Sequence, residues 1–310
     1  MTSHSSLNLY FCGGTGGNIG KQITDLDLNT CFIDTSSSNL KGVNESHIFL
    51  TPGLDGGGKD RSLVYENFKP FIEDILIRFK PSAQLNVVVA SLAGGSGSVI
   101  APLIVKELIS KNHNTIVISV DSRHSLKEID NTIKTLKTFQ SIADTTKKPI
   151  SMFYIENKSR KQADTTAIQF INLLSVLVDK RHTEEFDTRD LFNFINYTKV
   201  TDNKPSVSII EVGSNEGVIP EKNTSIVSTI LVTKNKDSTI SDTKPEYLST
   251  CIVTDPSYTN EDIRVDNILG KISNLVEELD TLIQTFQDNK KINKVKELSV
   301  TSNTEDGIVL

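Results

Sequence analysis

The stretch LNVVVASLAGGSGSV, residues Leu85–Val99, joins a run of β-branched side chains to a loop rich in glycine and serine. The run Leu85–Ala90 is typical of a strand that is buried on both faces of a parallel sheet. The residues that follow Ser98 favour a helix, whose N-terminus carries about half a positive charge. Because glycine lets a bound group approach the backbone closely, the stretch predicts an anion-binding turn between a strand and a helix.

The first half of the chain repeats this alternation of strand and helix. Strands are expected at four further apolar runs: Leu7–Cys12, Cys31–Asp34, Thr115–Val120 and Ile150–Ile155. Helices are expected at Ser62–Phe79 and Ser125–Ile142, and in the second of these apolar residues recur at steps of three and four. Together these elements predict an α/β fold with a mainly parallel sheet that is covered on both faces.

The second half combines long helical stretches with strands separated by polar turns. Helices are expected at Arg160–Arg181, Thr188–Thr198 and Glu261–Gln287, and strands at Ser206–Gly213, Thr224–Thr233 and Leu248–Thr254. The helix from Glu261 is expected to cover the core, because its apolar stripe is too short for a coiled coil. We predict a nucleotide-type domain over 1–159, a central helix over 160–182, a smaller α/β domain over 183–260, and a C-terminal helix with an extended acidic tail over 261–310.

The composition argues against several classes of protein. The chain has 310 residues and a formal net charge of −6, which disfavours a general binder of nucleic acids or of membrane surfaces. No run reaches the roughly 18 apolar residues of a membrane span, and the N-terminus lacks the pattern of a secretory signal. Cys12, Cys31 and Cys251 do not have the spacing of metal ligands, so we expect buried thiols and no metal site built from protein side chains.

Three glycine-rich loops are expected to leave the front edge of the parallel sheet: Cys12–Ile23, Thr51–Arg61 and Leu92–Val99. Loops that leave the same edge of a parallel sheet favour a nucleotide lying across them, held by backbone N–H groups. The first loop does not fit a P-loop, because Thr15 stands where a glycine is needed and Gln22 where a serine or threonine is needed.

The dinucleotide fingerprint also fails at the first loop, where Ile19 replaces its last glycine. A monomeric NAD(P)-binding oxidoreductase that holds a ribose through Asp34 remains the alternative. Tyr154 and Lys158 are four residues apart, as in some dehydrogenases, but Tyr154 lies within a strand-like run and not on a helix.

The loops resemble those of the tubulins and of their bacterial relative FtsZ, over about residues 7–200. The segment AGGSGS (Ala93–Ser98) is similar to the signature loop of that family, GGGTGS/TG, and FCGGTGGNIG (Phe11–Gly20) is similar to its first loop. The segment IDTSSS (Ile33–Ser38) stands at the second loop, and Thr51–Arg61 resembles the third, which faces the terminal phosphate. The family also carries two acids at a D-x-x-D spacing after its central helix, which Asp187 and Asp190 match.

The resemblance implies a set of nucleotide-binding residues in the loops and near the base. Asp164 or Thr165 falls at the base position of the central helix, and Asn157 fits a base-side asparagine. The implied set is Gly13, Gly14, Thr15, Gly16, Gly17, Asn18, Asp34, Thr35, Ser36, Gly56, Gly57, Gly58, Ala93, Gly94, Gly95, Ser96, Gly97, Ser98, Asn157 and Asp164. The hydroxyls of Ser96 and Ser98 are expected to join the backbone in holding the α- and β-phosphates.

The short chain without a long linker is most similar to the bacteriophage tubulins of the PhuZ type. That likeness implies binding of GTP or GDP with Mg²⁺ and self-assembly into a longitudinal homopolymer. It also implies hydrolysis completed by Asp187 and Asp190 of the adjacent subunit, in the cytoplasm of the bacterial host. The polymer would position phage DNA, capsids or the phage nucleus indirectly, and no direct nucleic-acid binding is expected. The acidic tail would dock on the next subunit, with Arg61, Lys69 or Arg78 as candidate receptors.

The sequence departs from the family at several positions. The signature loop has two adjacent glycines where three are usual, carries Ser96 in place of threonine, and continues into Val99 where a glycine is usual. The fifth loop, Val120–Glu128, does not match the FtsZ pattern, so the residues that hold the ribose stay open.

Overall fold

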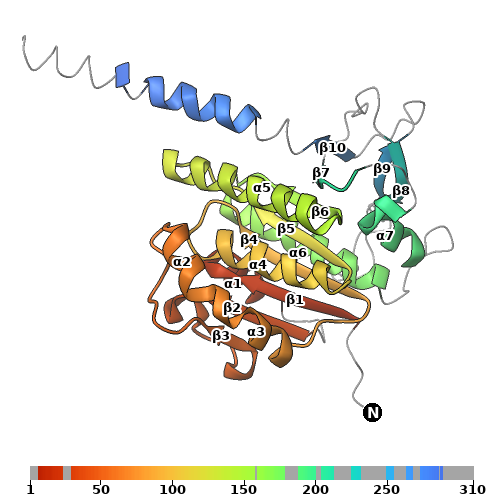
Figure 1. Cartoon of the computed structure of the whole chain (residues 1–310), viewed down its shortest axis with the longest axis horizontal. Helices are drawn as coiled ribbons and strands as arrows, with labels where there is room; N and C mark the ends of the chain where they lie inside the picture. The colour runs from red at the N-terminus through yellow and green to blue at the C-terminus, as the bar shows by residue number, and fades with distance from the viewer. Residues whose placement is uncertain are drawn as a thin grey trace, which may run out of the picture.

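The computed structural model describes residues 6–23, 29–157, 159–178, 188–199, 204–212, 225–231, 249–254, 263–267, 273–285 and 287–288. Within these residues an eight-stranded sheet has the strand order β10-β7-β6-β5-β4-β1-β2-β3 (Figure 1). Its strands are β1 Leu7–Cys12, β2 Asn29–Asp34, β3 Ile48–Leu50, β4 Leu85–Ser91, β5 Thr115–Val120, β6 Ile150–Ile155, β7 Val207–Val212 and β10 Ile263–Asn267. The pairs from β3 to β7 are parallel, and β10 pairs with β7 antiparallel. The predicted α/β fold is therefore confirmed.

Helices cover both faces of this sheet. They are α1 Gly13–Gly20, α2 Arg61–Phe68, α3 Ile72–Arg78, α4 Gly97–Ser110, α5 Leu126–Thr146, α6 Arg160–Val178 and α7 Thr188–Ile195. Short 3₁₀ turns lie at Ser37–Leu40, Glu45–His47, Lys69–Phe71 and Tyr197–Lys199. A separate antiparallel pair, β8 Ser225–Leu231 and β9 Ser249–Thr254, lies near α7 (Figure 1).

The strands alternate their buried side chains between two cores. Val88 of β4 belongs to the core that includes Ile100 of α4 and Leu136 of α5, whereas Val87 belongs to the core that includes Phe170 of α6. Such continuous burial on both faces explains why the strands read as unbroken apolar runs. The two cores fix the orientation of the sheet edge from which the glycine loops leave.

The structure divides the helix that was expected over Ser62–Phe79. Here α2 ends at Phe68, a 3₁₀ turn spans Lys69–Phe71, and α3 begins at Ile72. Pro70 lies in that turn and has no backbone N–H to donate, so a continuous helix would lose a hydrogen bond there. The expected single helix is wrong, although both halves are helical.

The expectation of a helix over Glu261–Gln287 is wrong in its first part. Residues Ile263–Asn267 form β10, and a helix covers 273–285. Ile263 and Val265 alternate with the charged Arg264 and Asp266, which is the period of a strand. Leu275 of the following helix is buried in the core shared with α4 and α5, as expected for a helix that covers the core.

The strands β7 and β10 extend the main sheet beyond β6, so backbone pairing joins the described parts of the second half to the first. The division at residues 159, 182 and 260 stays a prediction.

Candidate functional site

The glycine loops meet where the order of the sheet reverses direction. Strands β1 and β4 are neighbours, but the chain continues from β1 to one side of the sheet and from β4 to the other. Crevices at the carboxyl ends of such strands are the usual ligand sites of open α/β sheets. The helix α1 begins directly after β1, and α4 begins six residues after β4. The first backbone N–H groups of both helices have no acceptor within their helix, so they can bind an anion in this crevice.

The first loop and the signature loop touch through glycines. A Cβ built on Gly13 would lie 2.5 Å from the backbone nitrogen of Gly97, and one built on Gly97 would lie 2.7 Å from the carbonyl oxygen of Cys12. Gly13 also has a φ of +71°, which side chains rarely adopt. These two glycines therefore let the starts of α1 and α4 lie side by side.

The third loop packs on the signature loop in the same way. A Cβ on Gly57 would lie 2.9 Å from the nitrogen of Ser96, and one on Gly95 would lie 2.8 Å from the nitrogen of Lys59. A side chain at either position would push the two loops apart. The close packing of backbone on backbone is a feature of phosphate cradles, in which N–H groups of several loops converge.

The second loop joins this group through hydroxyl and backbone contacts. The hydroxyl oxygens of Thr35 and Ser96 are 2.6 Å apart, and the Gly56 N–H donates to the Thr35 carbonyl at 2.9 Å. The Ser36 hydroxyl donates to the carboxylate of Asp55 at 3.2 Å. The structure thus brings the second, third and signature loops together with the start of α1 at one edge; the expected first loop is wrong as a loop, because Gly13–Gly20 form α1.

Asp34 at the end of β2 is turned into the protein. One carboxylate oxygen accepts from the Thr35 N–H at 2.6 Å, and the other accepts from the Asn39 side-chain amide at 2.9 Å. The residue is only 1 % exposed. Because both oxygens are engaged, Asp34 stabilises the second loop and is a poor partner for the ribose of a dinucleotide.

The two serines of the signature loop differ in orientation. The Ser98 hydroxyl is buried and donates to the carbonyls of Gly94 at 2.5 Å and Gly95 at 3.2 Å. It therefore closes the loop on itself, whereas Ser96 faces the second loop. Val99, where the family has a glycine, lies in the first turn of α4 and is buried in the core, which explains how a side chain fits there.

Of the residues predicted at the base side, Asp164 and Thr165 lie on α6, and Asp164 contacts a residue that follows α1. Gln22, just after α1, donates through its side-chain amide to the Asn18 carbonyl at 3.0 Å and to the Asp164 carboxylate at 3.2 Å. Asp164 is buried on α6, whereas the alternative Thr165 is exposed and donates to the Lys161 carbonyl. Gln22 is a contact that the sequence did not single out.

Asn157, the other base-side prediction, is half-buried just beyond β6. It and the loop residues stay predicted nucleotide contacts.

Arg61 joins α2 to α4 and α5 behind the signature loop. Its guanidinium donates to the Ser98 carbonyl at 2.8 Å and also to the hydroxyls of Thr135 and Thr138. Pro102, inside α4, has no N–H for the usual bond to the Ser98 carbonyl four residues earlier, so Arg61 supplies the donor. Burial lowers the pKa of Arg61 to about 10.

The fifth loop contains a charged junction around Arg123. This side chain pairs with the buried Asp121 at 2.6 Å, with Glu156 at 3.1 Å and with Glu278 of the helix over 273–285 at 3.0 Å. The Tyr154 hydroxyl also donates to Asp121 at 2.5 Å. Burial and the neighbouring carboxylate raise the pKa of Tyr154, so this phenol is unsuited to the proton transfer that an oxidoreductase would need.

The predicted catalytic acids and the tail are covered only in part. Asp187 and the tail residues 291–310 lie outside the described residues, as does Lys158. Asp190 lies on α7, and the structure describes its backbone but not its side chain. Within the described ranges, no group of three or more His, Cys, Asp or Glu side chains is arranged to hold a metal ion, and no helix has the length and hydropathy to span a membrane.

Sequence comparison finds relatives among phage proteins. A phage tubulin-like protein of Pseudomonas phage PhiPA3 is 34% identical over 201 residues, which are 64% of this chain and 63% of that protein. The chain thus spans less than two thirds of the length of the curated relatives that it matches. No protein-family model matches it.

Solved structures give the same fold over more of the chain. The phage tubulin PhuZ with GDP superposes with a TM-score of 0.72 at 24% identity, over 92% of this chain and 93% of that one. The protofilament of TubZ from bacteriophage PhiKZ superposes with a TM-score of 0.69 at 23% identity, over 92% of each chain. The oxidoreductase alternative receives no support from these likenesses.

Proposed function

We propose, on the premise that this chain has the tubulin/FtsZ fold and resembles phage tubulin-like proteins in sequence, that it binds GTP and assembles into cytoskeletal filaments. Hydrolysis of GTP would follow assembly.

The observation that carries this proposal is the contact of the glycine loops at the switch point of the sheet. Gly13 against Gly97, and Gly57 against Gly95, leave room for backbone but not for side chains. An anion placed before the starts of α1 and α4 would receive N–H groups from both helices. A triphosphate, which carries several charged oxygens in a row, suits a cradle that is shared between loops.

We assign hydrolysis to acids of a neighbouring subunit, because α7 lies at the opposite edge of the sheet from the glycine loops. Asn196, which follows α7, donates to the side chain of Asn114 at 3.0 Å, just before β5 begins. The glycine loops leave the carboxyl ends of the strands, about 20 Å away for strands of this length. Asp187 and Asp190 would therefore reach the nucleotide of the next subunit in a head-to-tail stack, where they would orient or deprotonate the attacking water.

Mg²⁺ would enter with the nucleotide. This ion keeps several waters and is held largely through substrate phosphates, so it does not need a cage of protein carboxylates. The Thr35 and Ser96 hydroxyls and the Asp55 carboxylate offer the oxygen ligands that it prefers. When bound, it would neutralise charge on the phosphates.

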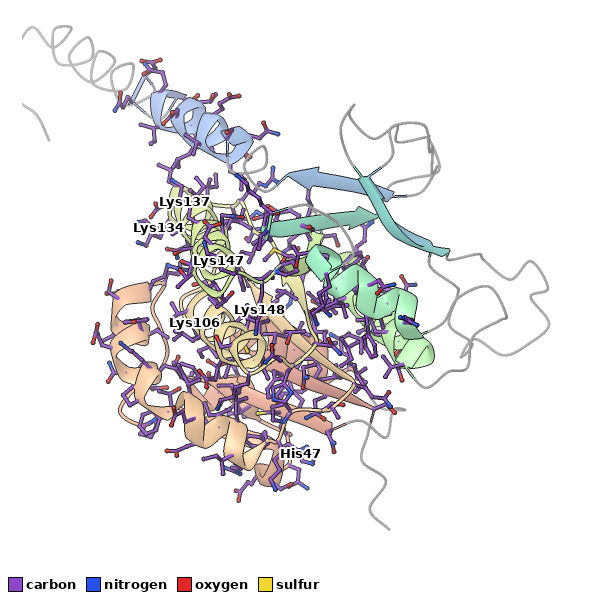
Figure 2. The ribbon with its side chains drawn as sticks, turned by 45° about the vertical axis from the view of Figure 1, so that its right-hand side comes forward. His47, Lys106, Lys134, Lys137, Lys147 and Lys148 are labelled. Carbon is purple, nitrogen blue, oxygen red and sulfur yellow. The ribbon has the colours of Figure 1, made fainter. Side chains whose placement is uncertain are left out.

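The acidic tail would dock on the next subunit in a groove between α2, α4 and α5. This groove has a volume of about 420 Å³, and its lining includes Arg61 and the exposed Lys106. Figure 2 shows Lys134 and Lys137 on α5 at the same side of the molecule as Lys106. Of the other two cations expected as receptors, Lys69 lies over the ring of Tyr65, and Arg78 lines a different cavity.

The proposed cellular role is supported by the relatives, which are phage proteins. We propose that the filament works in the host cytoplasm and positions phage DNA, capsids or the phage nucleus without itself binding nucleic acid.

The test is light scattering of the purified chain after addition of GTP with Mg²⁺, with GDP and with NADPH as controls. A rise with GTP alone, followed by release of phosphate, is expected. Binding of NADPH without any response to GTP would overturn the proposal in favour of an oxidoreductase.

A further inference from the structure

We propose that Asn131 and Glu128 of α5 are positioning residues that fix the third loop against the signature loop, and so set the preference of the site for GTP over GDP. This inference rests on the proposed function, in which the third loop faces the terminal phosphate. Neither residue was singled out by the sequence.

Asn131 bridges the two loops from behind. Its side-chain amide donates to the carbonyl of Lys59 in the third loop at 3.3 Å and to the carbonyl of Ala93 in the signature loop at 3.1 Å. The residue is fully buried. Because both neighbours are acceptors, the NH₂ group must face them, and the orientation of the amide is fixed.

Glu128 lies one helical turn earlier on α5 and contacts the third loop through the side chain of Lys59. Its carboxylate accepts from the Lys59 ammonium at 2.9 Å, and from Ser122 and the backbone of His124 in the fifth loop at 2.9 and 3.0 Å. Burial opposes ionisation of Glu128, but the hydrogen bonds from Lys59 and Ser122 hold its pKa below the ordinary value. Lys59 is thus held at its carbonyl and at its ammonium by one helix.

The contacts of Asn131 and Glu128 with Lys59 form a bracket around the third loop. The loop depends on this bracket because several of its residues have positive φ. Gly53, Gly56, Gly58 and Lys59 all have positive φ, and Lys59 has no glycine freedom to make that conformation easy. Surrounding contacts must hold such a residue in place. Without the contacts from Asn131 and Glu128, the backbone of Lys59 can leave its positive φ. The packing of Gly57 against Gly95, which sets the distance between the two loops, is then lost.

GTP and GDP differ only by the terminal phosphate. A displacement of the third loop should therefore lower the affinity for GTP more than the affinity for GDP. A general loss of stability should lower both affinities alike. The ratio of the two affinities separates a positioning role from a structural one.

The experiment compares Asn131→Ala with Asn86→Ala. Asn86 is a matched control, because it is also fully buried and its amide donates to two carbonyls, those of Ser82 and Asn114, at the other end of the sheet. Titration with both nucleotides should show GTP affinity about tenfold lower for Asn131→Ala, the size expected for a lost hydrogen bond, with GDP affinity little changed. The ratio should stay at the wild-type value in Asn86→Ala.

Two further variants cover the case in which Asn131→Ala unfolds. Asn131→Asp keeps the volume but places an anion against two carbonyls, and Glu128→Gln removes the charge from the Lys59 pair while keeping the size. Both should lower the GTP-to-GDP affinity ratio. An unchanged ratio in every folded variant would overturn the proposal.

Hydrogen exchange without nucleotide distinguishes this inference from the proposed function. Asn131→Ala should speed exchange in residues 56–60 and 93–97, and Asn86→Ala should not. If the wild type does not bind GTP, the proposed function fails, yet faster exchange would still support the bracket. Equal exchange in both variants would contradict it.

Discussion

At the scale of single residues, the close packing of the site depends on glycines, which have no Cβ. Gly13 and Gly42 both have positive φ, but a Cβ on Gly13 would meet the backbone of Gly97 whereas one on Gly42 would meet nothing within 4 Å. The pair separates the effect of backbone conformation from the effect of close approach.

Gly13→Ala should destabilise the fold more than Gly42→Ala. Both lose about 1 kcal/mol to the left-handed backbone, and Gly13→Ala adds roughly 1–3 kcal/mol of overpacking. Urea unfolding measures the difference, and nucleotide titration should show loss of GTP binding for Gly13→Ala alone. Equal unfolding free energies would mean that the loops tolerate a wider gap.

Asp190→Ala should bind GTP and assemble like the wild type but hydrolyse far more slowly. Loss of a group that activates water typically lowers the rate by about 10²–10⁴-fold. Phosphate release from pelleted filaments measures this, with the exposed, neighbouring Arg189→Ala as a control. Normal turnover by Asp190→Ala filaments would remove this acid from the mechanism.

At the scale of elements, Arg61 of α2 links α4 and α5, because it supplies a hydrogen-bond donor that α4 lacks. Pro102 leaves the Ser98 carbonyl without its helical partner, and Arg61 of α2 donates to it instead. The two residues act as one unit, so their substitutions should not be additive.

Arg61→Ala should lower the free energy of unfolding by about 1–3 kcal/mol, because it leaves a buried carbonyl without a donor. In a Pro102→Ala background, α4 regains its own N–H and the same substitution should cost about 1 kcal/mol less. A double-mutant cycle by urea unfolding measures the coupling. A coupling of zero would show that Arg61 acts only through Thr135 and Thr138.

Elements also show where prediction from sequence succeeds. The strands around β4 and the glycine loops were predictable because unbroken apolar runs and glycines report local requirements of the backbone. The strand β10 was missed because Ile263 and Val265 stand beside a longer helical pattern, and only the antiparallel partner β7 decides between the two. Pro70 signals the break between α2 and α3 locally, yet the periodicity on both sides concealed it.

The polar residues behind the site could not be predicted from the sequence for a different reason. Asn131, Thr135 and Arg123 lie on ordinary helix and loop positions, and each has a partner that is between 43 and 155 residues away. A lone sequence does not reveal such partners, because they arise when the helices pack on the sheet. The nucleotide contacts themselves and the acid pair stay predictions.

At the scale of the whole molecule, the resemblance to phage tubulins is confirmed by sequence over 64% of the chain and by fold over 92% of it. The glycine loops and α7 lie at opposite ends of the strands, which suits the proposed head-to-tail polymer. In it, the acids near α7 of one subunit would complete the nucleotide site of the next.

Deletion of residues 298–310 should abolish filaments at concentrations at which the full chain pellets. The tail would supply acids and the apolar residues Ile308, Val309 and Leu310 to the groove between α2, α4 and α5. Sedimentation with GTP measures assembly, and Lys106→Glu should weaken it in the full chain by reversing the charge of the groove. Unchanged pelleting of the truncated chain would defeat the docking of the tail.

The link between Pro102 and Arg61 has a consequence for the history of the sequence. A lineage that replaces Pro102 restores the N–H of α4, so the Ser98 carbonyl no longer needs Arg61 as a donor. Loss of Arg61 alone leaves that carbonyl without a hydrogen bond. The order of changes is therefore constrained: position 102 should change before position 61. Related chains should carry the two residues together, or carry neither, and a chain that keeps only the proline should show another donor at the Ser98 carbonyl.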